Sequence, residues 1–129
     1  MELCFLDTNV CVDLLRNRVR GRRLPGFAQC RLSSVVVAEL WAGASKAADP
    51  TVQGVKLAGL LDALEQLPFG AEAARHYGSI RAALEQAGTP IGPLDQLIAA
   101  HARSADATLL TANLREFKRV PGLKCQAWE

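Results

Sequence analysis

The sequence lacks the features that would place the protein in a membrane or outside the cell. No apolar run approaches the ~18 residues that a transmembrane helix needs. The chain opens Met-Glu-Leu, without the basic segment that begins a secretory signal peptide. No two of the four cysteines are spaced as C-x-x-C, which excludes zinc-finger and thioredoxin-like readings. We therefore expect a cytoplasmic protein whose cysteines are reduced and partly buried.

Several catalytic motifs are also missing. The chain has no G-x-G-x-x-G after a strand and no G-x-x-x-x-G-K-[ST], so a nucleotide cradle is unsupported. It has no G-x-S-x-G nucleophile elbow. The two histidines, His76 and His101, are far apart and belong to no metal-type cluster, so packing roles are favoured for both. Any chemistry must come from acidic residues.

Short apolar runs alternate with helical patterns along the 129 residues, half of which are hydrophobic. The length favours a single domain over residues 1–129. Alternating strands and helices predict an α/β fold with a parallel sheet covered on both faces. The predicted strands are 2–6, 31–33, 67–69, 108–110 and 123–126. One predicted helix follows the first strand and ends near Arg16. The others span 34–44, 51–66, 71–87 and 93–104.

Three carboxylates have no basic residue within a helical turn. Asp7 follows the first strand, Glu39 is the only charge of segment 34–44, and Asp95 follows Pro93 in a first helical turn. Helix capping would explain Asp7, and the helix dipole would explain Asp95. Buried unpaired charges are costly unless they are paired or bind metal. If the three converge at the strand ends, they form an oxygen site for Mg²⁺ or Mn²⁺.

Polar residues also follow the strand that ends at Leu110. Thr111 and Asn113 could hydrogen-bond a carboxylate or a metal-bound water, although a polar turn would also explain both.

Five arginines lie within eight residues, and they give this weakly charged chain, with a net charge of +2, a local basic patch. They contact either solvent or nucleic-acid phosphates. They are Arg16, Arg18, Arg20, Arg22 and Arg23.

Four segments together resemble the VapC toxins of bacterial type II toxin–antitoxin pairs, which are PIN-domain ribonucleases. They are LDTNV at 6–10, SVVVAELWAGA at 34–44, GTPIGPLDQLIAAHA at 88–102 and LLTANLREFKRVPGLKCQAW at 109–128. The likeness covers essentially the whole chain. It implies a three-layer PIN-like fold, with a central parallel sheet of about five strands. It also implies an Mg²⁺-dependent endoribonuclease that cuts structured RNA, often transfer RNA, and so inhibits translation.

The resemblance assigns roles residue by residue. It makes Asp7, Glu39 and Asp95 the acidic site, with Asp7 and Asp95 the strongest metal ligands, and Asn9 and Thr111 polar supports. The family often carries a fourth acid where this chain has Asn113. We therefore expect three acids from these positions and one principal metal ion, with Asn113 in support.

The resemblance further implies a VapB-like antitoxin that inserts a basic side chain into the acidic site. The apolar pattern of segment 51–67 exceeds one core-facing stripe, and Trp41 follows Glu39 by two residues. These features suit a partner surface, although core packing or a homodimer interface would also explain them. DNA binding would belong to the antitoxin, because no segment of this chain indicates a helix-turn-helix or basic zipper.

Two other classes remain open. A phosphatase could use Asp7 as a nucleophile, but the phosphatases that do so have a second Asp where this chain has Asn9. A PIN-like binding module without turnover is the non-enzymatic alternative, and Asn113 is its only support.

Overall fold

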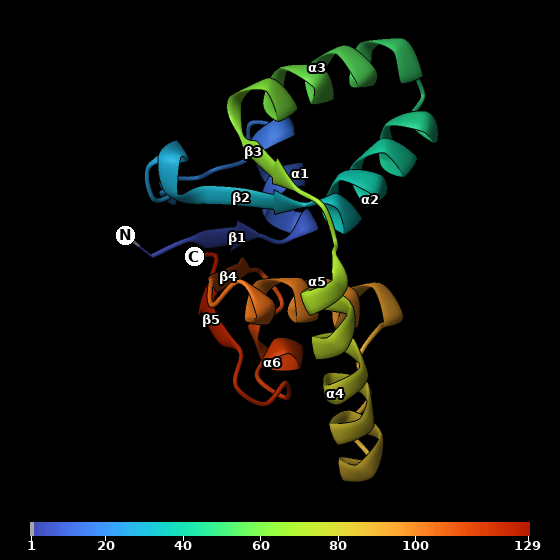
Figure 1. Cartoon of the computed structure of the whole chain (residues 1–129). Coiled ribbons are helices and arrows are strands. Elements are labelled where there is room, and N and C mark those ends of the chain that lie inside the picture. Colours follow the sequence, from blue (N-terminus) through green and yellow to red (C-terminus); the bar gives the residue numbers. More distant parts are fainter. Residues whose placement is uncertain (1) are drawn as a thin grey trace.

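A parallel five-stranded sheet forms the centre of the molecule. The computed structural model describes residues 2–129, and the strand order is β3-β2-β1-β4-β5 (Figure 1). The strands are β1 (Cys4–Leu6), β2 (Cys30–Ser33), β3 (Glu65–Leu67), β4 (Thr108–Thr111) and β5 (Lys124–Ala127). Every neighbouring pair is parallel, as the alternation of strands and helices predicts.

The described residues form six α-helices that flank this sheet. They are α1 (Thr8–Leu15), α2 (Ser34–Ser45), α3 (Pro50–Ala63), α4 (Ala71–Ala87), α5 (Pro93–Ser104) and α6 (Leu114–Phe117). In Figure 1, α2 leaves the carboxyl end of β2 and meets α3 at an angle, and α4 runs against α5 and projects past it. None of the helices in the described chain has both the length and the apolar character needed to cross a membrane.

The core lies between the helices and the sheet. Phe5 and Leu6 of β1 are buried, as are Ile98 of α5 and Phe117 of α6. Three of the cysteines are buried and all four are free thiols, as predicted.

Strand ends place the helix starts at one edge of the sheet. Asp7 directly follows β1 and caps α1, and Ser33 ends β2 and caps α2 with a bond from the Val35 N–H. The helix predicted over 34–44 thus begins at the expected residue, with Ser33 as its cap. Because parallel strands share a direction, both helices begin at the carboxyl edge, where ligands bind in such sheets.

The segment after α3 differs most from prediction. The helix predicted over 51–66 begins at Pro50, capped by Asp49, and ends at Ala63. The strand predicted at 67–69 lies at 65–67 instead. Glu65 and Gln66 are exposed on an edge strand, so they carry no alternating apolar signal, and an Arg31–Glu65 ion pair holds the edge to β2.

Candidate functional site

Asp7 is buried, with each carboxylate oxygen held by a hydrogen bond. The Thr8 N–H donates to Oδ1 at 2.8 Å, and the Thr111 hydroxyl donates to Oδ2 at 2.7 Å. Burial raises the pKa of Asp7, and the two hydrogen bonds oppose that rise. The side chain is therefore fixed in orientation, and each oxygen keeps a lone pair for another contact.

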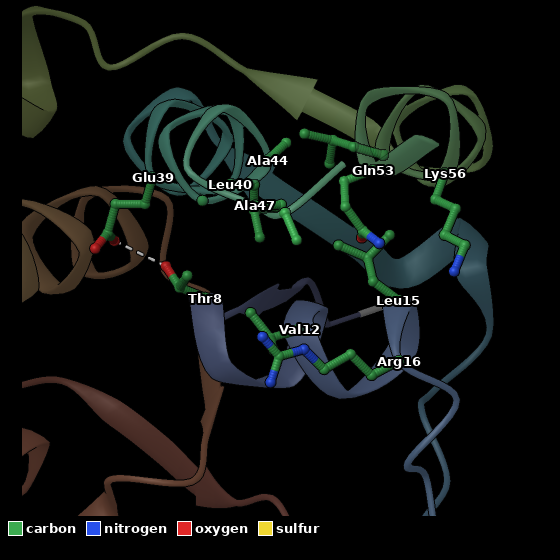
Figure 2. Close-up of a pocket in the computed structure, with 13 residues that line it drawn as sticks. Thr8, Val12, Leu15, Arg16, Glu39, Leu40, Ala44, Ala47, Gln53 and Lys56 are labelled. Carbon is green, nitrogen blue, oxygen red and sulfur yellow. Dashed lines mark hydrogen bonds between the residues drawn. The ribbon is translucent and has the colours of Figure 1, made fainter. Parts of the chain in front are cut away.

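Glu39 reaches the same edge from α2. The Thr8 hydroxyl donates a 2.8 Å hydrogen bond to Glu39 Oε1, drawn as the dashed line in Figure 2. Thr8 thus orients two carboxylates at once, that of Asp7 through its backbone and that of Glu39 through its side chain. Sequence reasoning assigned no role to Thr8, because a Thr in a first helical turn is ordinary in itself.

Asp95 feels the negative charges of three other acids. Its pKa is raised to about 6, first by burial and then by the negative charges of Asp7, Glu116 and Glu39. These three acids come from three other elements of the fold, yet all act on one carboxyl group. We refer to Asp7, Glu39, Asp95 and Glu116 as the acidic site. No salt bridge within residues 2–129 reaches any of the four.

Glu116 is the site residue that sequence reasoning missed. The Asn113 side chain donates from Nδ2 to Glu116 Oε2 at 2.9 Å, and the Asn113 N–H donates to the Thr111 hydroxyl at 2.9 Å. Thr111 and Asn113 therefore support carboxylates, as their position predicts. In addition to the three acids expected at the motif positions, Glu116 on α6 is a further acid whose negative charge helps to raise the pKa of Asp95. Its spacing from Asn113, one helical turn, was the available signal.

Asn9, the remaining predicted support, lies exposed in the first turn of α1, and its side chain makes no hydrogen bond within residues 2–129.

The arginine cluster separates into two kinds of residue. The Arg22 guanidinium donates to the Val19 and Arg18 carbonyls and to Asp13 Oδ2, and it stacks over the Trp128 ring at 4.6 Å. The indole N–H of Trp128 donates to the same Asp13 oxygen at 3.0 Å. Arg22 therefore anchors this loop to the carboxyl-terminal segment, a structural role that the cluster did not predict.

The other arginines are exposed, and one of them lines a groove. Arg18 Nη2 lies 3.6 Å from Asp13 Oδ1. Among the described residues, Arg20 and Arg23 form no salt bridge, and neither does Arg16, which lines the groove. In Figure 2 the Arg16 guanidinium points back along α1, toward the end of the groove where Thr8 lies.

This groove, which we call the α1–α2–α3 groove, has a volume of about 350 Å³. Thr8 and Glu39 lie at one end, and apolar side chains such as Leu40 and Leu57 line its length. Lys56 of α3 adds a cation beside Gln53. Outside it, Trp41, Val52 and Val55 are exposed, so part of the apolar pattern of α3 is surface rather than core. The groove therefore runs from an acidic end along apolar side chains that are flanked by Arg16, Gln53 and Lys56.

The donor set of the acidic site suits a hard divalent cation. Carboxylate oxygens are the ligands that Mg²⁺ and Mn²⁺ prefer, and the mutual repulsion at Asp95 is what a bound cation would relieve. As the side chains stand, no three Asp, Glu, His or Cys residues within 2–129 lie close enough to enclose an ion. Two carboxylates completed by waters fit this arrangement, since Mg²⁺ usually keeps several waters.

Comparison with known proteins identifies the family and agrees with the fold. A model of the PIN domain family matches residues 4–123. The tRNA(fMet)-specific endonuclease VapC of Salmonella typhimurium is 40% identical over 127 residues, 96% of each chain. Ribonuclease VapC2 of Rickettsia felis is 40% identical over 130 residues, 97% of each chain.

Solved structures give the same answer. The chain superposes on a chain from the crystal structure of DNA-bound VapBC from Salmonella typhimurium with a TM-score of 0.89, 36% identity and full coverage of both chains. The chain belongs to the PIN domain family and, within it, to the VapC ribonucleases.

Proposed function

We propose that the protein is an Mg²⁺-dependent endoribonuclease toxin, which cleaves structured RNA and inhibits translation until a VapB-like antitoxin neutralises it. Transfer RNA is the substrate class we expect, in line with the name of the Salmonella relative. One observation carries the proposal: four carboxylates converge at the carboxyl edge of the sheet, where no salt bridge of the described residues neutralises them.

Asp7 and Asp95 would hold the metal, with Glu39 close by, and Mn²⁺ would substitute for Mg²⁺. When bound, the metal would lower the pKa of a coordinated water and neutralise phosphate charge. Glu39 would orient or deprotonate the attacking water, and the Thr8 hydroxyl holds its carboxylate in place for this role. Thr111 fixes Asp7, and Asn113 fixes both Thr111 and Glu116.

The exposed arginines would contact the RNA backbone. Arg16, Arg18, Arg20 and Arg23 are exposed, whereas Arg22 is committed to Asp13 and Trp128. We therefore assign phosphate contacts to the four exposed residues. Binding should weaken with salt, because phosphate contacts release counterions.

The α1–α2–α3 groove would receive the antitoxin. Its mixed apolar and polar lining suits an extended or helical amphipathic segment, and its Thr8–Glu39 end suits a basic side chain aimed at the acids. An arginine there could bond two carboxylate oxygens and compete with metal. The similarity to chains solved as VapBC complexes supports such a partner.

Three further features belong to this proposal. The toxin would act in the cytoplasm, as a homodimer, and would reach DNA only through its antitoxin. A crystal structure of the Salmonella relatives is of a DNA-bound VapBC complex, which supports the last point.

A cleavage assay tests the proposal. Purified protein is incubated with total small RNA in Mg²⁺ or in EDTA, with Asp7→Ala as the matched control and p-nitrophenyl phosphate as a second substrate. We expect Mg²⁺-dependent RNA fragments from the wild type alone, and mapping their 5′ ends identifies the substrate. Release of p-nitrophenol without RNA cleavage would indicate a phosphatase, and no turnover of either would indicate a binding module.

A further inference from the structure

A buried histidine joins the two helices that carry Glu39 and Asp95. His101 of α5 is 5% exposed, and its Nδ1 lies 2.7 Å from the hydroxyl oxygen of Ser33, the residue that caps α2. Phe5 and Phe69 contact the imidazole edge to face, with ring centroids 5.1 and 5.6 Å away. The packing leaves the ring little freedom to turn away from Ser33.

The hydroxyl group of Ser33 bonds both to the start of α2 and to His101. Its oxygen accepts a 3.1 Å hydrogen bond from the Val35 N–H, which caps α2, and the same group bonds to His101. Burial lowers the pKa of His101, which favours the neutral ring. Either tautomer of the neutral ring keeps the bond, because a hydroxyl both donates and accepts.

On the solvent side, the two helices are separated rather than packed. An open apolar groove of about 430 Å³, the α2–α5 groove, lies between them; Val35, Ala38 and Glu39 line one wall, and Leu94 and Leu97 line the other. The Ser33–His101 bond is the one side-chain hydrogen bond between the capped start of α2 and α5 within residues 2–129. Beneath the groove the two helices share the apolar core, and this bond adds a directional link between them.

The bond is placed symmetrically with respect to the two acids. Ser33 lies six residues before Glu39, and His101 lies six residues after Asp95. Each helix is rigid over such a length, so a shift at the bond would move the acid at the other end. A displacement near 1 Å at a catalytic group can cost about 100-fold in rate.

We propose that Ser33 and His101 form a positioning pair that sets the separation of Glu39 and Asp95 and thereby the geometry of the acidic site. The inference rests on the proposed function of that site. Neither residue touches RNA or metal in this account; both act through the helices that carry the acids.

The test compares His101→Leu, which fills the space without the bond, with His101→Asn, whose amide can reach Ser33 from the Nδ1 position. The matched control is His76→Leu on α4, which removes a histidine that does not contact the acidic site. His76 Nδ1 accepts a 2.9 Å hydrogen bond from Arg103 Nε. Assays run well below the Tm of each variant. Readouts are kcat and KM for RNA, and the Mn²⁺ concentration that gives half of the maximal Tm shift.

We expect kcat of His101→Leu to fall about 10-fold and its Mn²⁺ midpoint to rise by a similar factor, the scale of losses around metal ligands, with KM unchanged. His101→Asn should recover most of both, and His76→Leu should lose stability without losing kcat. Unchanged kcat and midpoint in His101→Leu would overturn the inference, as would equal losses in His76→Leu.

Two outcomes separate this inference from the proposed function. If the wild type binds Mn²⁺ but cleaves no RNA, the proposed function fails, and the Mn²⁺ midpoints alone decide about the pair. If His101→Leu does not fold, Ser33→Ala and Ser33→Thr replace it. Threonine restores the hydroxyl and should recover the midpoint that alanine loses, whereas equal midpoints would contradict the pair.

Discussion

Charge gathers in two regions of this molecule, and the two are built in opposite ways. In the loop after α1, Arg22 is bonded to Asp13 and stacked on Trp128, so its charge is neutralised inside the fold. In the acidic site burial, and after it the negative charges of three neighbouring acids, raise the pKa of Asp95 to about 6, and no cation of the described residues compensates for them. The comparison shows that a charge with a built-in partner stabilises the fold, whereas charges left facing one another are ready for a ligand.

The largest effect should come from removing an acid. Asp7→Asn keeps the shape of the side chain and the hydrogen bond to Thr8 but removes the charge. RNA cleavage should fall by about 100-fold or more, the scale seen when one oriented electrostatic group is removed from a site. Single-turnover rates in Mg²⁺ measure it, with circular dichroism as the control for folding. Cleavage near the wild-type rate would remove Asp7 from the site.

Removing Arg22 should lower the stability of the protein, in contrast to the removal of an acid, which should lower its activity. Arg22→Ala leaves Asp13 with one fewer charged donor and uncovers Trp128, so the protein should lose about 1–3 kcal/mol of stability. Arg20→Ala is the matched control, because Arg20 is exposed in the same loop, and it should change stability by less than about 0.5 kcal/mol. Urea unfolding measures both. Equal midpoints for the two variants would show that the arginine cluster is uniform after all.

The sequence predicts many of the residues in these two regions, but it does not predict which of them come together in space. Local spacing alone singles out the three acids without nearby bases. It also predicts the capping role of Asp7 and the hydrogen-bonding roles of Thr111 and Asn113. Convergence depends on the order of the strands, which no local pattern contains.

Glu116 and Arg22 illustrate what sequence reasoning could not supply. Glu116 looks like an ordinary helix acid, and only the packing of α6 brings its charge to Asp95. Arg22 looks like its neighbours, and only the return of the carboxyl-terminal segment places Trp128 beneath it. The end of α3 was missed for a related reason, since the polar edge strand Glu65–Leu67 gains its pairing from β2 rather than from its own residues.

A smaller effect is expected from the hydroxyl that holds Asp7. Thr111→Val keeps the shape of the side chain but removes the 2.7 Å hydrogen bond to Asp7 Oδ2. Because that bond lowers the pKa of Asp7, its loss should raise the pKa further and reduce cleavage about 10-fold. The Thr108→Val variant, on the same strand but bonded to the exposed Glu2, should cleave normally. Identical rates in the two variants would separate Thr111 from catalysis.

The smallest effect concerns pH. In the metal-free protein Asp95 holds its proton up to a pKa of about 6, whereas in the unfolded chain it titrates near 4. The native state therefore binds more protons between about pH 4 and 6, and stability should decline as the pH rises through that window. Asp95→Asn should flatten this part of the profile, as measured by urea midpoints in EDTA. A wild-type profile that rises through the window would contradict the clustering of the acids.

Metal-dependent stabilisation tests the central claim most directly. The Tm of the wild type and of Asp95→Asn is measured in EDTA and across a titration with Mg²⁺ or Mn²⁺. If the acidic site is an unneutralised cation site, Asp95→Asn starts at a higher Tm in EDTA, and only the wild type gains Tm as the metal is added. A wild type that gains nothing, or a variant that gains as much, would contradict the claim that the acidic site holds a cation.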